Sequence, residues 1–245
     1  MSPDLELASR LADAADAISL PRFRTGLAIE TKPDLTPVTE ADRAVEVELR
    51  RILAAERPDD AILGEEQGAA GSGARRWILD PIDGTRNYAR GIPVWGTLIA
   101  LEVEGVVQLG MVSAPALSHR WWAERGAGAF ADGQAIHVSA VSRIEDSVLS
   151  FAIEDSVPAI AKRAWHARGF GDFWSYMLIA EGSVDGAADG PGVGEWDLAA
   201  TQVIVEEAGG RFSDRHGEAR IDSGSAVASN GLIHDELLAA LGAGS

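Results

Sequence analysis

The order of helical and strand-like patterns along the 245 residues limits the fold of this chain more than any other feature. Apolar residues recur at three- and four-residue steps over residues 5–18 and again over residues 39–57, ahead of Pro58. This spacing is typical of amphipathic helices, and Thr39 and Asp42 are spaced like the two partners of a capping box. We therefore predict two helices before the first long strand.

Short apolar runs bounded by turn residues predict strands over much of the remaining chain. They lie at residues 61–63, 77–79, 96–101, 106–112, 120–123, 128–131, 135–138, 148–151, 184–188, 211–213 and 226–229. Helical spacing returns at residues 172–181, 196–208 and 234–241. Helices and strands in this order indicate a layered α/β or α+β fold. We expect one domain over residues 1–245, because the linker-like stretch 68–74 is too short to separate two domains.

Charge and composition exclude several classes of function. The chain has 21 Lys and Arg against 38 Asp and Glu, a net charge of −17. Nucleic acid is not an expected partner, because phosphate backbones bind to stripes of basic residues. No apolar run approaches the roughly 20 residues of a membrane span, and the first residues lack a signal-peptide pattern, so we expect a cytoplasmic protein with no membrane partner. Because the chain has no cysteine, any metal must bind to oxygen or histidine.

Acidic residues, rather than histidines, form the candidate sites. The five histidines show no ligand-like spacing, which disfavours a zinc site and a histidine nucleophile. Acidic clusters lie where a strand is expected to end or a helix to begin, at residues 64–66, 80–85 and 195–197. One such cluster alone is most often a solvated rim, since most charged side chains face water.

The segment 80–85, Asp-Pro-Ile-Asp-Gly-Thr, is the most informative of the three clusters. Pro81 fixes the backbone between the two aspartates, and Gly84 permits a tight turn and a close approach to a ligand. Two carboxylates with the Ile82 carbonyl between them suit a hard divalent cation. The following amides and the Thr85 hydroxyl suit a phosphate at a helix N-terminus.

Oxygen ligands select Mg²⁺, Mn²⁺ or Ca²⁺ rather than softer metals. Mg²⁺ characteristically binds through a few carboxylates together with a substrate phosphate. A pair of cations that clamps the attacking and leaving oxygens of a phosphoryl group needs several carboxylates around it. Glu65, Asp80, Asp83 and Asp197 would be sufficient in number.

The chain resembles the inositol monophosphatase family in four segments, residues 64–66, 77–85, 196–200 and 207–210. The Asp-Pro-Ile-Asp-Gly-Thr sequence joined to a downstream Trp-Asp is highly specific, and the likeness extends from the first helix to the C-terminus. The resemblance implies the five-layered αβαβα sandwich of the sugar-phosphatase superfamily. It also implies a homodimer.

Carried over residue by residue, the resemblance implies a metal site made of Glu65, Asp80, the Ile82 carbonyl, Asp83 and Asp197. The site would hold two or three Mg²⁺ ions, with Mn²⁺ as a substitute. The resemblance further implies that Thr85 and Glu65 orient a metal-bound water for attack on phosphorus, and that Asp42 supports Thr85 or an additional, weaker metal. On its sequence pattern alone, Asp42 is equally well explained as a helix-capping residue.

Within the family, the bacterial histidinol-phosphate phosphatases are most similar, in residues 32–34, 37–42, 90–95 and 171–173. The expected reaction is therefore the hydrolysis of L-histidinol phosphate, a small phosphorylated substrate of histidine biosynthesis. Inositol 1-phosphate or another small phosphomonoester is the alternative substrate. A non-catalytic acidic protein that binds Ca²⁺ or a partner is a third hypothesis, but it would require the loss of Thr85 or of a metal ligand.

Substrate-binding residues are expected around the metal site. Gly84 and Thr85 are expected to bind the phosphate. An ammonium and an imidazole are best bound by carboxylates and aromatic faces, and the candidates are Trp95, Phe170, Asp172, Trp174 and Asp189. Core packing is the alternative role for the aromatic residues, and a solvated loop for the acids.

One position departs from many relatives, which carry a substrate-contacting Glu where this chain has Gly190. Either Asp189 or Glu195 is expected to replace that Glu. The surrounding segment is rich in glycine, so its path is not predictable from the sequence. Glu66 and Lys32 are weaker candidates, for the metal and for the phosphate respectively.

Overall fold

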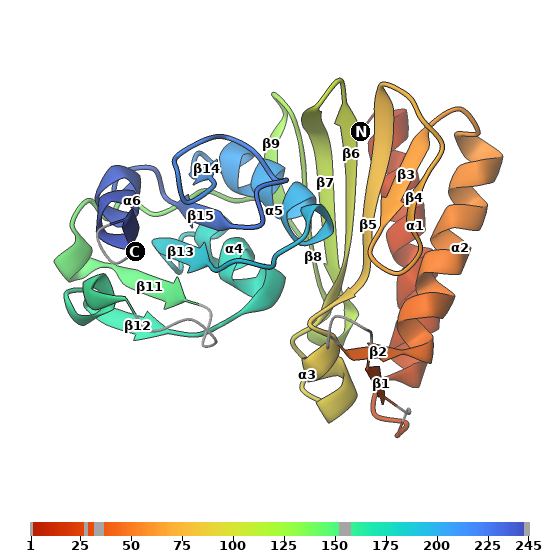
Figure 1. The fold of residues 1–245 in the computed structure, drawn as a ribbon, viewed down its shortest axis with the longest axis horizontal. Helices are drawn as coiled ribbons and strands as arrows, with labels where there is room; N and C mark the ends of the chain where they lie inside the picture. Colours follow the sequence, from red (N-terminus) through yellow and green to blue (C-terminus); the bar gives the residue numbers. More distant parts are fainter. Residues whose placement is uncertain (1, 27–28, 32–36, 152–157, 243–245) are drawn as a thin grey trace.

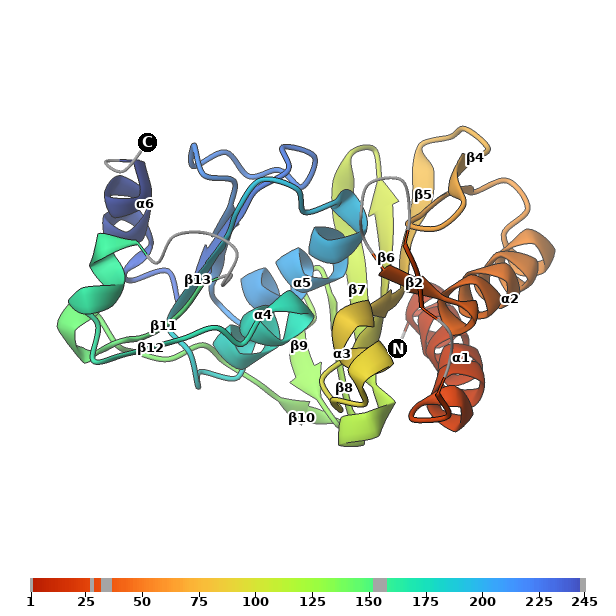
Figure 2. The same cartoon turned by 60° about the horizontal axis from the view of Figure 1, so that its bottom comes forward.

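The computed structural model describes the chain in four segments, residues 2–26, 29–31, 37–151 and 158–242. Its elements lie in five layers (Figures 1 and 2). α1 (Pro3–Ser19) and α2 (Glu40–Glu56) cover one face of an eight-stranded sheet. α4 (Asp172–Ala180) and α5 (Glu195–Glu207) separate it from a five-stranded sheet, whose outer face is covered by α6 (His234–Gly242). The layered αβαβα prediction is confirmed.

The large sheet has the strand order β10-β9-β8-β7-β6-β5-β3-β4, and only β3 and β5 pair in parallel among the described strands of this sheet. Its strands are β3 (Ala61–Gly64), β4 (Gly68–Ala70), β5 (Arg75–Asp83), β6 (Gly96–Val103), β7 (Val106–Ala114), β8 (His119–Glu124), β9 (Gly128–Ala131) and β10 (Gln134–Ala135). The expected hairpin is confirmed as β6 and β7. α3 (Thr85–Arg90) follows directly on β5.

The small sheet has the order β12-β11-β13-β15-β14. Its strands are β11 (Val148–Phe151), β12 (His166–Arg168), β13 (Gly186–Asp189), β14 (Arg211–Ser213) and β15 (Ala226–Ser229). β11 runs parallel to β12 and β13, and the other pairings are antiparallel. A separate antiparallel pair, β1 (Ile29–Thr31) and β2 (Pro37–Thr39), leads into α2.

Alternation along the central strands divides the core into two layers. On β5, Trp77 and Leu79 pack with α1 and α2, whereas Ile78 packs with α4 and α5. Ile99 and Leu98 on β6 divide in the same way. Because successive strand residues point to opposite faces, a continuous apolar run such as Trp77-Ile78-Leu79 is what a sheet covered by helices on both faces requires.

α5 approaches the large sheet closely because Gly110 of β7 has no side chain. A Cβ atom at Gly110 would lie 2.5 Å from the carbonyl oxygen of Ala200 on α5. Backbone carbonyls do not yield to such a contact, so only glycine allows this packing. The packing fixes the start of α5 relative to the ends of the central strands, where the candidate site lies.

The predicted start of α2 is confirmed. The Thr39 side chain accepts a hydrogen bond from the Ala41 amide, and the Asp42 side chain accepts one from the Thr39 amide at 2.9 Å. These contacts satisfy backbone donors that the first turn of a helix leaves open.

Other predicted boundaries are wrong. The strand expected at 135–138 ends at Ala135, and beyond it the Val138 amide donates to the Ala208 carbonyl at 3.1 Å, outside any sheet ladder. The stretch expected to be linker-like contains β4, which pairs with β3. β12 was not predicted. In the described part of the chain, none of the helices is long and apolar enough to cross a membrane.

Candidate active site

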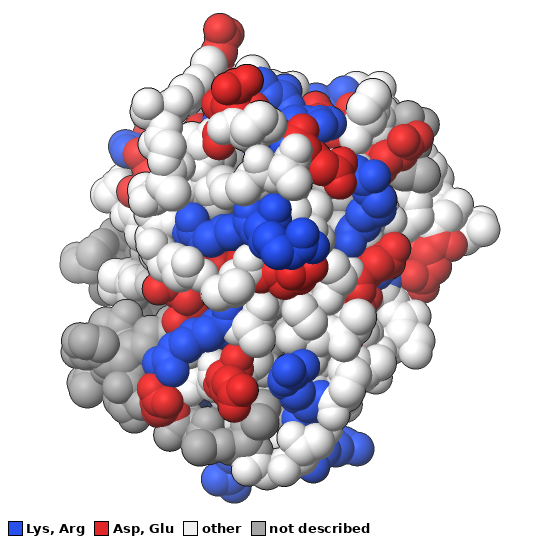
Figure 3. All heavy atoms as spheres, turned by 90° about the vertical axis from the view of Figure 1, so that its right-hand side faces the viewer, with Lys and Arg blue, Asp and Glu red and all other residues white. Residues whose placement is uncertain are grey.

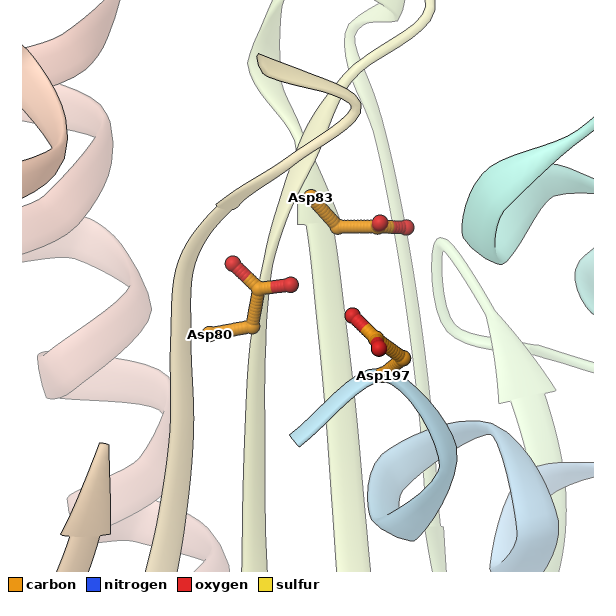
Figure 4. A group of neighbouring side chains, drawn as sticks. All are labelled: Asp80, Asp83 and Asp197. Carbon is orange, nitrogen blue, oxygen red and sulfur yellow. The ribbon is translucent and has the colours of Figure 1, made fainter. Parts of the chain in front are cut away.

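Three of the predicted metal ligands meet at one end of the large sheet. Asp80 and Asp83 lie on the last residues of β5, and Asp197 lies in the first turn of α5. One carboxylate oxygen from each lies within 4.8 Å of the other two (Figure 4). Asp197 lies 117 positions after Asp80 in the sequence and comes from a different layer, so only the fold brings these carboxylates together.

An irregularity in β5 turns both strand carboxylates toward this centre. Residues three apart on a regular strand point to opposite faces. The pairing of β5 with β6 shifts between Asp80 and Asp83, and the Thr97 hydroxyl donates to the Pro81 carbonyl at 2.8 Å within the shifted region. The shift around Pro81 therefore replaces the normal alternation and lets Asp80 and Asp83 converge.

Backbone amides hold the carboxylates of Asp83 and Asp197 in place. The Phe173 amide at the start of α4 donates to Asp83 Oδ2, and the Gly194 amide donates to Asp197 Oδ2 at 2.6 Å. The second contact is a capping interaction at the start of α5. Asp83 and Asp197 are thus each held by a backbone amide at the start of a helix, α4 and α5 respectively.

The crowding of these carboxylates is electrostatically unfavourable without a cation. Burial and then the charge of Glu65 raise the pKa of Asp80 well above its ordinary value, and burial and then the charge of Asp172 do the same for Asp83. Burial, with the charges of nearby acids, raises the pKa of Asp197 to about 7. The buried Oδ1 of Asp80 has no hydrogen-bond partner within the described residues. An oxygen-only donor set with an unsatisfied buried oxygen fits a hard divalent cation.

Glu65 and the Ile82 carbonyl border the same centre. Glu65 follows β3 and lines the cavity together with Asp80, Asp83 and Asp197. Its charge contributes to the raised pKa values of Asp80 and Asp197. The Ile82 carbonyl lies 2.9 Å from the Thr85 hydroxyl. The ligation of a metal by Glu65 and Ile82 stays a prediction.

Thr85 and Asp42 are in contact, which fits one of the roles that the family resemblance implies for Asp42. The Thr85 hydroxyl lies 3.1 Å from Asp42 Oδ1 and 2.9 Å from the Ile82 carbonyl, both of them acceptors. Asp42 also caps α2 through its other oxygen, Oδ2. The observed position of Asp42 therefore fits both a helix-capping role and a role in supporting Thr85. Burial raises the pKa of Asp42.

A cavity of about 480 Å³ adjoins the carboxylate centre. Beyond the acids already described, its lining includes residues from the turn after β5, from the start of α4 and from the end of β13: Gly84, Thr85, Arg86, Asn87, Phe170, Asp172, Tyr176 and Asp189. The predicted phosphate-binding and leaving-group residues on this list thus share one cavity with the carboxylate centre.

Gly84 is required at its position by the backbone. It has a φ of +79°, and a Cβ atom there would lie 3.1 Å from the Val94 carbonyl and 3.2 Å from Asp172 Oδ2. This left-handed conformation turns the chain from β5 into α3, whose first residue is Thr85. The turn places the backbone of Gly84 and Thr85 on the cavity wall.

Trp95 does not line this cavity. Its side chain is fully buried, and its ring packs against Tyr88 at 4.8 Å and Phe23 at 5.4 Å between centroids. The prediction that Trp95 contacts the substrate is therefore corrected to core packing, because a fully buried indole offers no surface to a ligand. Trp174 is likewise outside the described lining of the cavity.

The two candidates for the missing Glu occupy different places. Asp189 lines the cavity and accepts a hydrogen bond from the Tyr176 hydroxyl. Glu195 instead forms an ion pair with Arg76 at 2.6 Å and borders a separate cavity. Asp189 is thus the candidate that reaches the substrate side. Lys32 lies outside the described residues.

Tyr176 is a cavity residue that the sequence interpretation missed. It is four positions after Asp172 on α4, so both residues lie on the same helix face. That spacing was visible in the sequence, but the tyrosine was not distinguishable there from a core aromatic. Arg86 and Asn87 are further polar lining residues that the sequence interpretation did not name.

Comparison with known proteins places the chain in a family. The model of the inositol monophosphatase family matches residues 1–243. The chain belongs to that family. It is therefore a phosphatase-family enzyme that acts on small phosphorylated substrates.

Two similar curated relatives match over nearly the whole chain. A histidinol-phosphatase from Mycobacterium tuberculosis is 51% identical over 98% of this chain and 98% of its own length. A second from Streptomyces coelicolor is 49% identical over 96% and 95%, respectively. Among solved structures, an IMPase from Thermotoga maritima has a TM-score of 0.91 at 32% identity, covering 99% of this chain and 98% of that one.

Proposed function

We propose that this protein is a Mg²⁺-dependent phosphomonoesterase that hydrolyses L-histidinol phosphate to L-histidinol and phosphate. The convergence of Asp80, Asp83 and Asp197 at the wall of a substrate-sized cavity supports the reaction class. The identity of about half of all positions with two histidinol-phosphatases supports the substrate.

Two or three Mg²⁺ ions, or Mn²⁺ in their place, would be held by Glu65, Asp80, Asp83, Asp197 and the Ile82 carbonyl. When bound, such ions neutralise phosphoryl oxygens and make water a better nucleophile near neutral pH. The chain has no cysteine that could act as a nucleophile. The reaction needs no covalent phosphoenzyme, because the protein chiefly positions the reactants. This metal set fits the raised pKa values of the three aspartates, because cations remove the repulsion between them.

The residues after β5 position the attacking water and the phosphate. Asp42 can accept the proton of the Thr85 hydroxyl, at 3.1 Å, which turns the Thr85 lone pairs toward a water in the cavity. Glu65, on the same cavity wall, can accept a proton from that water. The amides of Gly84 and Thr85, at the start of α3, can donate to a phosphoryl oxygen.

The leaving group would contact the cavity residues that bind neither the metals nor the phosphate. Histidinol carries an ammonium and an imidazole, and Asp172, Asp189 and Phe170 supply two carboxylates and one aromatic ring for them. These two carboxylates are additional to the four proposed for the metals. An uncharged polyol such as inositol 1-phosphate is the second candidate, supported by the similarity of the fold to the Thermotoga maritima IMPase.

Phosphate release tests the proposal. It is measured from L-histidinol phosphate, inositol 1-phosphate, fructose 1,6-bisphosphate and adenosine 3′,5′-bisphosphate, each with Mg²⁺ and with EDTA. We expect Mg²⁺-dependent turnover in which kcat/KM for L-histidinol phosphate exceeds the others by about a hundredfold, or ~2.7 kcal/mol. Preference for another ester would retain the metal site and reject the substrate, and no release from any ester would reject the reaction.

Several further properties belong to the same proposal. We propose that the enzyme consists of a single domain and forms a homodimer. We also propose that it is cytoplasmic, in an organism that makes histidine. Sedimentation of the purified protein and growth of a histidine-requiring strain that carries its gene are the measurements that check the dimer and the biosynthetic role.

A further inference from the structure

Three polar side chains follow one another along one face of α2. Asp42, Glu46 and Arg50 stand four positions apart, so they lie on the same side of the helix. Asp42 and Glu46 are both 0% exposed, although carboxylates are seldom fully buried without partners. Val45 and Leu49 on the same helix pack in the core between the helices and the large sheet. The donors that these buried carboxylates bind therefore show what α2 holds in place.

Glu46 holds the turn between β3 and β4. Its Oε2 accepts a hydrogen bond from the Glu66 amide at 2.7 Å, and its Oε1 accepts one from the Gln67 amide at 3.1 Å. Arg50 donates from Nε to Glu46 Oε1 at 2.7 Å, and from Nη2 to the Gly68 carbonyl. The Glu46–Arg50 pair therefore binds the backbone of three consecutive residues of this turn.

The same turn carries Glu65, whose main chain is fixed before and after it. The Glu65 amide donates to the Leu79 carbonyl of β5 at 3.2 Å. Directly before it, a Cβ atom at Gly64 would lie 2.2 Å from Glu46 Oε1, so the pair lies against the backbone there as well. The two amides directly after Glu65 are those that Glu46 binds. The direction in which the Glu65 side chain leaves the backbone is thus set by α2 and β5.

α2 also holds a second residue of the site. The Thr85 hydroxyl lies 3.1 Å from Asp42 Oδ1. Thr85 and Glu65 belong to different elements, the start of α3 and the turn after β3, so their spacing depends on a third element. Asp42 and Glu46 are four residues apart on one helix, a rise of about 6 Å along its axis. One turn of α2 therefore sets the spacing of the two residues that are proposed to orient the attacking water.

We propose that Glu46 is a positioning residue, which fixes Glu65 at the distance from Thr85 that the attacking water and a divalent cation require. This inference rests on the proposed phosphomonoesterase function and deepens it, because it assigns the alignment of the site to a residue outside the cavity. Glu46 is not among the described residues that line the cavity. It acts on the reaction only through the turn that it holds.

A substitution that removes an acceptor without changing the size of the side chain tests this role. Glu46→Gln replaces one carboxylate oxygen by an amide nitrogen, which cannot accept a hydrogen bond. The wild type, Glu46→Gln, Glu65→Gln and the double variant are compared. kcat and KM for L-histidinol phosphate are measured at saturating Mg²⁺, and the dissociation constant of Mn²⁺ is measured by calorimetry without substrate. The free energy of unfolding of each variant is measured as well, so that only folded proteins are compared.

Asp60 offers a matched control at the other end of β3. Its side chain is 9% exposed and accepts hydrogen bonds from Arg75 Nε at 3.0 Å and from Trp77 Nε1 at 2.9 Å. It directly precedes β3 and is not among the described residues that line the cavity. Asp60→Asn therefore breaks a largely buried ion pair without touching the turn that carries Glu65.

We expect Glu46→Gln to lower kcat about tenfold and to weaken Mn²⁺ binding about tenfold, with KM changed by less than about threefold. In the Glu65→Gln background the same substitution should change either quantity by less than about twofold, because both substitutions act on one group. Asp60→Asn should leave kcat and the Mn²⁺ dissociation constant within about twofold of the wild type, even where it lowers the free energy of unfolding.

Losses that multiply in the double variant, or equal losses in Glu46→Gln and Asp60→Asn, would overturn the inference. If Glu46→Gln does not fold, Glu46→Asp replaces it, because it keeps a charge beside Arg50 but draws the carboxylate back from the turn. Wild-type kcat and Mn²⁺ binding in Glu46→Asp would also overturn the inference. A wild type that releases no phosphate from any ester would instead reject the proposed function, and the inference would fall with it.

Discussion

Glu46 and Asp80 are carboxylates buried almost completely in two regions of the protein that treat the charge in opposite ways. Glu46 on α2 is 0% exposed and Asp80 on β5 is 1% exposed. Glu46 forms an ion pair with Arg50 at 2.7 Å and accepts hydrogen bonds from the backbone amides of Glu66 and Gln67. Asp80 has acidic neighbours instead, and its Oδ1 has no hydrogen-bond partner among the described residues.

The comparison shows which region is complete without a ligand. A buried ion pair with satisfied hydrogen bonds needs nothing further, whereas a buried group of like charges must acquire a cation or a proton. On the surface formed around α1 and α2, acidic and basic side chains also lie next to one another (Figure 3), as in the pairs Arg57–Asp4 and Arg51–Glu48. The cluster of Asp80, Asp83 and Asp197 is therefore the exception that points to a metal.

The two regions are also connected. The amides that Glu46 binds, at 2.7 Å and 3.1 Å, belong to the two residues directly after Glu65. Gly64, directly before Glu65, leaves no room for a side chain, because a Cβ atom there would lie 2.2 Å from Glu46 Oε1. The Glu46–Arg50 pair thus holds the turn that presents Glu65 to the cavity.

The largest effect is expected from neutralising the carboxylate centre. Asp80→Asn should lower kcat/KM at least about a thousandfold, or ~4 kcal/mol, because a metal ligand is lost. The free energy of unfolding in EDTA should not fall, since one of several repelling charges is removed. Steady-state phosphate release and denaturant titration measure the two quantities, and undiminished Mg²⁺-dependent activity would contradict the assignment.

Breaking the other region should have the reverse signature. Arg50→Met leaves Glu46 buried without its guanidinium and should lower the free energy of unfolding by about 3 kcal/mol, with or without Mg²⁺. Arg51→Met is the matched control, because Arg51 and Glu48 form an ion pair on the surface. Its expected loss in the free energy of unfolding is under about 1 kcal/mol. Equal losses in the two variants would show that the buried pair is not stabilising.

The pH dependence of the metal-free protein sharpens the same contrast. Burial and neighbouring charges raise the pKa of Asp197 to about 7 from 3.8. A carboxyl group whose pKa is higher in the folded state stabilises the fold fully at low pH, and this contribution is lost as the pH rises from about 4 through about 7.

Asp197→Asn should remove that slope. In EDTA at pH 8 the variant should be more stable than the wild type, on the order of 2 kcal/mol, and the difference should shrink toward pH 4. Denaturant unfolding of both proteins across this range gives the difference directly. A wild type that is more stable than Asp197→Asn at pH 8 in EDTA would contradict the account.

The smallest effect concerns an ion pair that joins the two elements carrying the proposed metal ligands, β5 and α5. Arg76 on β5 contacts Glu195 on α5 at 2.6 Å, and these residues lie four and two positions before Asp80 and Asp197. Glu195→Gln should raise the Mg²⁺ concentration for half-maximal activity about threefold, because the first turn of α5 is then held less firmly against β5. Glu206→Gln, which breaks a pair with Arg125 near the other end of α5, is the control and should leave it unchanged.

Features with a local cause were predictable from the sequence. The start of α2 follows from Thr39 and Asp42, whose hydrogen bonds span three residues. The apolar run 77–79 gave the central strand because a sheet covered on both faces needs no alternation. Asp80 and Asp83 were predicted as metal ligands because an unusual segment follows that strand, and Asp197 because it lies in a separate acidic cluster that matches the Trp-Asp motif of the family.

Features that depend on distant packing were not predictable. β4 is a short edge strand of Gly and Ala, with no apolar pattern of its own, and forms because β3 offers it a partner. The sequence does not show that Trp95 packs against Phe23 and Tyr88, because an aromatic residue in an apolar stretch fits a core and a ligand site equally. The Tyr176 contact to Asp189 joins α4 to β13 and is set only by the fold.

The position of a cation is the most direct test of the account. Crystals grown with Mn²⁺ are recorded at the manganese absorption edge, where only the metal gives a strong anomalous signal. We predict an anomalous peak bounded by the carboxylates of Asp80, Asp83 and Asp197. Mn²⁺-dependent phosphate release together with no peak among these three carboxylates would contradict the central claim.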